Sequence, residues 1–202
     1  MRGLLIAFEG VDGCGKSTQA RRAALARGAH FTFEPGDTPL GVELRRWLLD
    51  AATPMEPTTE ALLMLADRSH HVRHVIEPRL AQGTSVFTDR FAPSTLAYQG
   101  YGRGVDLHAL HAATDLAIGD CRPALTVLID VPLEVANERR ARDHHDRFES
   151  ADLAFHERVR EGYLDMARRD RAHWFVVDGS GDEDEVAARI ERRLDELAWP
   201  HA

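Results

Sequence analysis

The residues from Gly10 to Ser17 follow the spacing G-x-x-x-x-G-K-[ST], which suits a loop that binds nucleotide phosphates. Glycines in such a loop let backbone N–H groups converge on phosphate oxygens, and a helix that begins there adds partial positive charge. Lys16 would reach the β- and γ-phosphates, and the Ser17 hydroxyl would be a ligand of Mg²⁺. The nucleotide-binding residues predicted from this motif are Gly10, Val11, Asp12, Gly13, Cys14, Gly15, Lys16, Ser17 and Thr18.

The flanking sequence favours this interpretation over a tight strand-to-helix turn with a surface lysine. Residues 4–8 are an apolar run typical of a buried parallel strand, and residues 19–26 are good helix formers that end at Gly28. Lys16 is the only lysine among 25 Lys and Arg residues, which indicates a need for a compact point charge at that position. Cys14 is interpreted as a backbone donor and not as a nucleophile.

Two further sites carry charges suited to phosphate chemistry. Asp89 follows an apolar strand, where proteins with such loops place a carboxylate that holds Mg²⁺ through water, and Arg90 could bridge two phosphates. The alternative for this pair is an ordinary surface ion pair. The arginine-rich stretch 139–147 is interpreted either as a solvated face or as a mobile segment that neutralises charge during phosphoryl transfer.

The apolar pattern predicts the elements that would position these residues. Strands are expected over 4–8, 29–33, 84–88, 125–129 and 174–177. Helices are expected over about 39–51, 57–82 and 106–119, after Pro132, over about 149–170, and from Asp182 onward. The helix over 57–82 should have an apolar face that includes Leu62 and should bend near Pro78, and residues 100–104 should be flexible. The alternation predicts one α/β domain over residues 1–202, with a five-stranded parallel sheet and helices on both faces.

Charged residues follow several of the predicted strands, namely Asp12, Glu34, Asp89, Arg90 and Asp130. In parallel sheets, ligands bind at the carboxyl ends of the strands. Charges gathered at that one edge are therefore interpreted as an active site.

Composition excludes several other classes of protein. The formal net charge of −8 argues against non-specific nucleic-acid binding, and no apolar run is long enough to cross a membrane. The N-terminus enters a strand without a signal peptide, and the two cysteines form no C-x-x-C pair. A cytoplasmic enzyme is expected.

Eight short motifs follow one another over nearly the whole chain. They are Phe8-Glu9-Gly10-Val11-Asp12-Gly13-x-Gly15-Lys16-Ser17-Thr18-Gln19, Glu34-Pro35-Gly36-x-Thr38-x-Leu40-Gly41, Ala66-Asp67-Arg68, Asp89-Arg90-Phe91, Ser94-Thr95-x-x-Tyr98-Gln99-Gly100, Gly102-Arg103-Gly104, Ile129-Asp130-Val131-Pro132 and Arg147-Phe148-Glu149. Together they resemble those of bacterial thymidylate kinases. The resemblance implies a P-loop nucleoside monophosphate kinase fold, phosphorylation of dTMP to dTDP by ATP with Mg²⁺, and a homodimer.

The resemblance also implies roles for individual residues. Arg68 would bond to the thymine, Arg90 to the phosphates, and Asp12 to the acceptor sugar or a neighbouring phosphate network. Thr95 and Gln99 would read the base edge, while Tyr98 would pack on the deoxyribose and disfavour a 2′-hydroxyl. The implied substrate-binding set is Asp12, Glu34, Met64, Arg68, Arg90, Thr95, Tyr98 and Gln99, and the Mg²⁺ ligands are Ser17 and Asp89.

The position of the catalytic arginine differs within the family. Here Gly13 and not an arginine follows Asp12, so a lid at about 139–149 should supply the charge, with Arg140 and Arg142 at the matching positions. The implied catalytic residues are Lys16, Arg90, Arg140 and Arg142.

Two positions depart from the family pattern. Met64 stands where the family has a phenylalanine that stacks on thymine, and Phe33 stands where bacterial members have an arginine. Both departures bear on the acceptor, so a kinase for another deoxynucleotide or a small hydroxyl compound is a second hypothesis. A non-catalytic nucleotide-binding protein would leave Arg90 and the lid arginines without a role. A GTPase needs a lysine in N/T-K-x-D, which this chain lacks.

The single lysine allows a direct test of the phosphate loop. Amine acylation can label only Lys16 and the N-terminus, and bound nucleotide should bury the Lys16 amine and keep it charged, whereas acylation needs the neutral amine. We expect saturating ATP with Mg²⁺ to slow the labelling of Lys16, read by peptide mass mapping, while Met1 reacts at an unchanged rate. Equal labelling with and without nucleotide would contradict the assignment.

Overall fold

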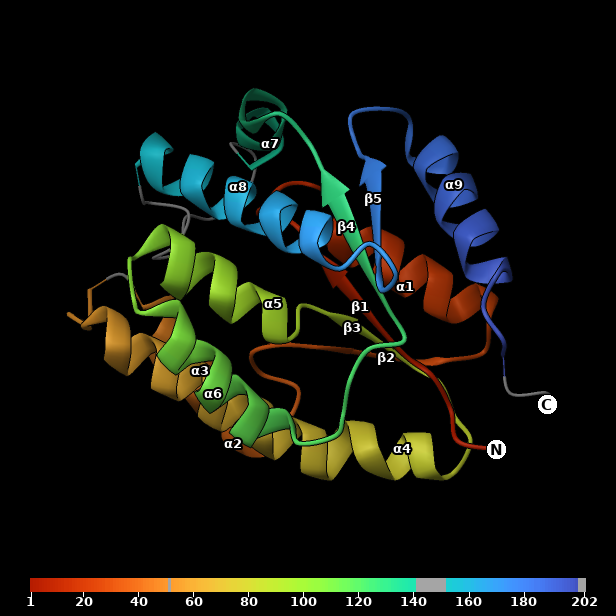
Figure 1. The fold of residues 1–202 in the computed structure, drawn as a ribbon, viewed down its shortest axis with the longest axis horizontal. Helices are drawn as coiled ribbons and strands as arrows, with labels where there is room; N and C mark the ends of the chain where they lie inside the picture. The colour runs from red at the N-terminus through yellow and green to blue at the C-terminus, as the bar shows by residue number, and fades with distance from the viewer. Residues whose placement is uncertain (51, 141–151, 200–202) are drawn as a thin grey trace.

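The computed structural model describes residues 1–50, 52–140 and 152–199, which form a five-stranded sheet between helices (Figure 1). The strands are β1 (Leu5–Glu9), β2 (His30–Phe33), β3 (Val86–Asp89), β4 (Leu125–Asp130) and β5 (Trp174–Asp178). They lie in the order β2-β3-β1-β4-β5, and every neighbouring pair is parallel. The predicted fold class is confirmed, and the strand bounds differ from the predicted ones by one or two residues.

Side chains of β1 alternate between two cores on opposite faces of the sheet. Leu5 and Ala7 pack with residues of α3 (Pro57–His71), α4 (Glu77–Ala81) and α6 (Leu107–Ile118). Ile6 and Phe8 pack with residues of α1 (Lys16–Ala26) and α9 (Glu183–Asp195). Because β1 is buried on both faces, its apolar run has no polar gap, as expected for a central parallel strand.

The remaining helical segments lie between and beside these elements. They are α2 (Pro39–Leu49), the π-helical η1 (Val72–Ile76), α5 (Ala92–Thr95), the π-helical η2 (Leu96–Gly102), α7 (Leu133–Arg140) and α8 (Leu153–Arg169). Side chains of Thr38, Asp106, Asp152 and Asp182 cap the N-termini of α2, α6, α8 and α9. Among the described residues, no helix combines the length and the apolar character needed to cross a membrane.

The helix predicted over 57–82 consists of three consecutive segments. A π-helical turn, η1, separates α3 from α4 just before Pro78, which has no N–H to continue the α-helical bonding. The prediction that Leu62 belongs to the apolar face was wrong, because its side chain is 59% exposed while its neighbour Ala61 is buried.

The prediction of a flexible stretch at 100–104 was wrong for its first residues, which belong to η2. A Cβ on Gly102 would lie 2.6 Å from a ring carbon of Phe155, and one on Gly100 would lie 2.4 Å from a methyl group of Leu107. Both glycines therefore allow close packing against α8 and α6. These glycines are needed for their lack of a side chain and not for flexibility of the backbone.

Candidate active site

The loop between β1 and α1 has the shape of a phosphate cradle. Gly10, Gly13 and Gly15 all have positive φ angles, of 144°, 82° and 90°. A Cβ on Gly15, at the start of α1, would meet no atom within 4 Å, so the space before the helix N-terminus is open. The N–H groups of this turn can therefore approach an anion.

Lys16 and Cys14 are both buried in this loop. The Lys16 ammonium donates to Asp12 Oδ1 at 3.2 Å and lies 3.5 Å from the Val11 carbonyl oxygen. Burial raises the pKa of the Cys14 thiol, which leaves it protonated and a poor nucleophile.

Ser17 and Asp89 are in contact although 72 residues separate them, because the Ser17 hydroxyl donates to Asp89 Oδ2. The other oxygen, Oδ1, is buried and has no hydrogen-bond partner among the described residues. A hydroxyl beside a carboxylate with a free oxygen fits Mg²⁺, which takes few protein ligands and keeps several waters. This pair would hold the ion in the presence of nucleotide.

Arg90 has a strained backbone, with a φ angle of 71° that is uncommon for a residue with a side chain. Two hydrogen bonds hold it: its N–H donates to the Phe8 carbonyl at 2.9 Å, and its own carbonyl accepts from Thr88 Oγ1 at 2.8 Å. Such a conformation costs about 1–3 kcal/mol and is typical of functional sites. It directs the Arg90 guanidinium back toward the phosphate loop.

Asp12 receives three donors from different parts of the chain. The guanidinium of Arg90 and the ammonium of Lys16 both donate to Oδ1, and the Tyr98 hydroxyl donates to Oδ2 at 2.8 Å. Burial alone would raise the pKa of Asp12, but the positive charges of Arg90 and Lys16 lower it below its usual range. Asp12 is therefore a carboxylate that ties the phosphate loop to the next site.

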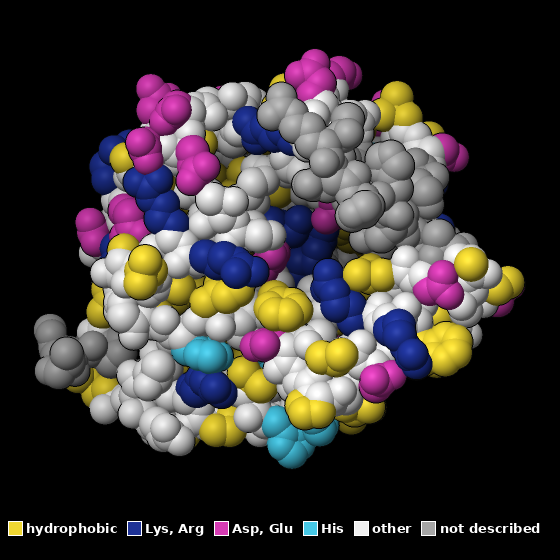
Figure 2. Space-filling model, turned by 180° about the vertical axis from the view of Figure 1, so that it is seen from behind, with side chains coloured by type: hydrophobic (Ala, Val, Ile, Leu, Met, Phe, Trp, Pro, Cys, Tyr) yellow, Lys and Arg dark blue, Asp and Glu magenta, His cyan; other side chains and the backbone are white. Residues whose placement is uncertain are grey.

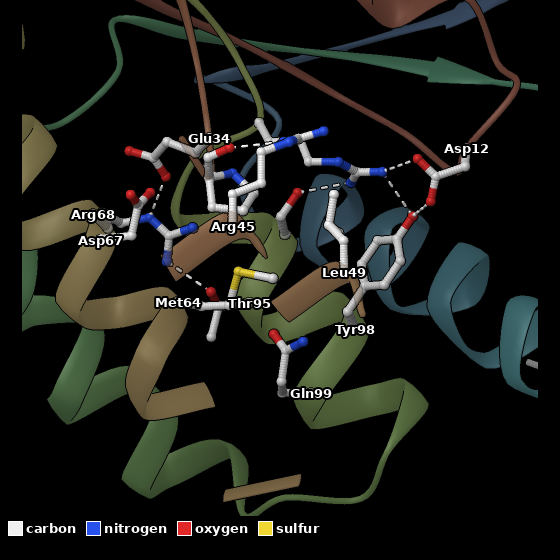
Figure 3. A pocket seen from close by; sticks show the side chains of 13 residues that line it. Asp12, Glu34, Arg45, Leu49, Met64, Asp67, Arg68, Thr95, Tyr98 and Gln99 are labelled. Atoms are coloured by element: carbon white, nitrogen blue, oxygen red, sulfur yellow. Dashed lines mark hydrogen bonds and ion pairs between the residues drawn. The ribbon is translucent and has the colours of Figure 1, made fainter. Parts of the chain in front are cut away.

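That next site is a cavity beside Asp12, which we call the Tyr98 cavity (Figure 3). Its lining residues are Asp12, Glu34, Pro35, Arg45, Leu49, Met64, Asp67, Arg68, Arg90, Ser94, Thr95, Tyr98 and Gln99. All eight residues predicted to bind the acceptor are among them, although they come from loops and helices between positions 12 and 99. Figure 2 shows a hollow in the opposite face of the molecule from Figure 1, with Lys and Arg side chains at its base.

Sequence reasoning missed five of these residues. Pro35, Asp67 and Ser94 lie within the quoted motifs but were given no role, while Arg45 and Leu49 are four positions apart on α2 and so share a face of that helix. The Arg45 guanidinium donates to the Pro35 carbonyl at 2.7 Å and lies 5.7 Å from the centre of the Phe33 ring. A cation therefore lies at the cavity next to Phe33, although residue 33 is not the arginine of the family pattern.

Arg68 is fully buried and donates to three groups: Glu34 at 2.8 Å, Thr95 Oγ1 at 2.7 Å and the Phe91 carbonyl at 2.9 Å. Burial would raise the pKa of Glu34, but Arg68, together with His71, lowers it below its usual range. A guanidinium has five N–H groups, so two remain for a ligand in the cavity.

Other predicted residues lie elsewhere. Asp130 makes a bidentate ion pair with Arg160, at 2.6 and 2.8 Å, and does not line the Tyr98 cavity. Arg140 ends α7, but its side chain is not described. Arg142 and the lid from residue 141 onward lie outside the described residues, so these assignments stay predictions.

Several known proteins that are similar to this chain belong to one family. The model of the Thymidylate kinase family matches residues 8–190. A thymidylate kinase of Geobacter sp. (strain M21) is 42% identical over 205 aligned residues, which cover 95% of this chain and 91% of the relative. One of Deinococcus radiodurans is 44% identical over 195, which cover 94% and 95%. A crystal structure of thymidylate kinase from Ehrlichia chaffeensis is similar with a TM-score of 0.79, at 32% identity, covering 96% of this chain and 99% of that one.

Asp67 should make the stability of the folded protein depend measurably on pH. Its Oδ1 is buried without a hydrogen-bond partner among the described residues, and burial, together with the charge of Glu34, raises the pKa of Asp67 to about 6. An aspartate in the unfolded chain has a pKa of about 3.9. As the pH rises from about 4 to 7, Asp67 therefore loses its proton in the unfolded chain before it does so in the folded protein. The free energy of unfolding should therefore fall over this range by about 2 kcal/mol on account of Asp67.

We expect Asp67→Asn to abolish this loss. The free energy of unfolding of the variant minus that of the wild type, measured by urea denaturation, should rise by about 2 kcal/mol from pH 4 to pH 7. A difference that is constant across this range would show that Asp67 does not titrate as described.

Proposed function

Because the chain belongs to the thymidylate kinase family, we propose that it transfers the γ-phosphoryl group of ATP to dTMP and releases dTDP. One observation carries the proposal: Asp12 bonds to Lys16 of the phosphate loop on one side and to Arg90 and Tyr98 of the Tyr98 cavity on the other. Donor and acceptor phosphates bound at these two places would meet beside Arg90.

The residues of the Tyr98 cavity suit a thymidine monophosphate. Arg68 keeps two N–H groups for carbonyl oxygens of a base, and Thr95 and Gln99 lie in the same cavity. The Tyr98 ring, fixed by its bonds to Asp12 and Arg90, would pack against the sugar. Met64 would contact the face of the base, where its thioether can pack on an aromatic ring.

In the proposed reaction, an oxygen of the dTMP phosphate attacks the γ-phosphorus while the bond to the bridging oxygen of ADP breaks. Ser17 and Asp89 would hold Mg²⁺, which supplies positive charge to the donor phosphates. Lys16 would bind the β- and γ-phosphates, and Arg90 would orient the acceptor phosphate beside them. Arg140 and Arg142 would stabilise the charge on the transferring group.

We also propose a homodimer in the cytoplasm, with residues 1–202 forming one catalytic domain that includes the lid at about 139–149. Several large apolar side chains on neighbouring helices support the dimer. Val42 and Trp47 on α2 are 57% and 50% exposed, and Leu62 on α3 and Leu116 on α6 are 59% and 83% exposed. Contiguous patches of exposed apolar side chains are typical of protein interfaces.

Met64 supports a second candidate, a kinase for another acceptor, because it replaces an aromatic contact in the Tyr98 cavity. One assay separates the two candidates: phosphorylation by ATP with Mg²⁺ of dTMP, dUMP, dCMP, dAMP, dGMP and shikimate under identical conditions. We expect dTMP to have the highest kcat/KM. Faster turnover of dCMP, a purine nucleotide or shikimate would contradict the proposed acceptor and leave the kinase class in place.

The lid arginines are open to a kinetic test. Arg142→Ala should lower kcat by roughly a hundredfold or more and leave ATP affinity nearly unchanged, as removal of an electrostatic transition-state donor does. Arg169→Ala is the control, because Arg169 is exposed and pairs with Asp165 on the surface of α8. Near-normal kcat in both Arg140→Ala and Arg142→Ala would make the stretch a solvated face.

A further inference from the structure

Glu60 in α3 contacts one of the base-reading residues from outside the cavity. Its side chain is 1% exposed, and its Oε1 accepts from Gln99 Nε2 at 2.9 Å and from Arg103 Nε at 3.1 Å. Gln99 lines the Tyr98 cavity, whereas Glu60 is not among the described residues that line it. The contact therefore acts on a ligand only through Gln99.

The chemistry of this contact determines which way the Gln99 amide is turned. A carboxylate can only accept hydrogen bonds, and a guanidinium can only donate them, so Glu60 is the acceptor for both neighbours. Gln99 must then face Glu60 with its NH₂ group, which leaves its carbonyl oxygen for the cavity. Figure 3 shows the Gln99 amide directed toward Met64 and Thr95, on the inner side of the cavity.

Arg68 presents the opposite kind of group on the same wall. Three of its five N–H groups are bonded to protein, and those that remain can only donate. The wall thus offers an acceptor from Gln99 and donors from Arg68. A base with a ring N–H next to a carbonyl matches this arrangement, as thymine and uracil do, whereas cytosine presents a ring nitrogen that accepts and an amino group that donates.

We propose that Glu60 is a positioning residue that fixes Gln99 as a hydrogen-bond acceptor and thereby selects bases with a ring N–H over cytosine. Without it, the nearly symmetric carboxamide could turn and bond to either kind of base. The inference rests on the proposed function, since it needs a pyrimidine nucleotide in the Tyr98 cavity.

Glu60→Gln tests the inference, because a glutamine at position 60 has nearly the same shape and can either donate to or accept from Gln99. Dissociation constants of dTMP, dUMP and dCMP would be measured by calorimetry on the full chain. We expect the preference for dTMP over dCMP to fall by about tenfold or more, which is the size of one well-placed hydrogen bond in a buried site. The preference for dTMP over dUMP should not change, because both bases have the ring N–H.

This pattern separates positioning from general damage, which would weaken all three ligands alike. Glu56→Gln is the matched control, because Glu56 is exposed one helical turn earlier and its side chain makes no cap hydrogen bond. Glu60→Ala is the second variant for the case that Glu60→Gln does not fold. It removes the carboxylate that holds the Gln99 amide, so that Gln99 can turn, and the same loss of preference is expected.

The outcomes distinguish the two proposals. A wild-type enzyme that does not prefer dTMP to dCMP contradicts the proposed acceptor, and the inference fails with it. A wild-type preference that persists in the folded variant overturns the role of Glu60 alone and leaves the proposed function in place.

Discussion

The contact between Asp12 and Arg90 is the interaction on which the rest of the candidate site depends. Asp12 belongs to the phosphate loop and Arg90 to the loop after β3, so this one ion pair joins the two ligand sites. Two buried charges are stable only when each is paired and hydrogen-bonded. Lys16 and Tyr98 complete the bonds of Asp12, and Ser94 and Tyr98 complete those of Arg90. Removing either charge would leave the other partly buried and without this partner.

Strand register explains why these groups meet. Asp89 pairs with Phe8 on one side and Phe33 on the other, so the residues that follow all three strands lie at the same level of the sheet edge. Glu9, at that level in β1, is fully buried, and its carboxylate accepts from the Phe91 N–H and the Ser94 hydroxyl. The sheet thus holds the loop that carries Arg90 in one place, and the strained backbone of Arg90 persists because its surroundings are fixed.

The local sequence was sufficient to predict the features that depend on local interactions and on the geometry of a parallel sheet. The strands, the phosphate loop and the contact of Ser17 with Asp89 follow from apolar runs, glycines and the geometry of parallel sheets. Membership of the Tyr98 cavity came from the resemblance, because no spacing rule joins Met64 to Thr95. The packing of Gly102 against Phe155, the ion pair of Asp130 with Arg160 and the contact of Glu60 with Gln99 depend on tertiary neighbours. Contacts of this kind cannot be recognised from the residues that are adjacent in the sequence.

Helix α2 lines the cavity with one face and is exposed to solvent on the opposite face. Arg45 and Leu49 line the Tyr98 cavity, Trp47 is exposed on the opposite face, and in this helix only Gly41 and Leu48 are buried. In the proposed dimer, a partner that covers Trp47 would also hold α2, and with it the wall of the cavity, in place. Assembly and acceptor binding would then be thermodynamically linked, each strengthening the other by the same factor. Dilution would lower the apparent affinity for the acceptor even without a direct contact between the partner and the acceptor.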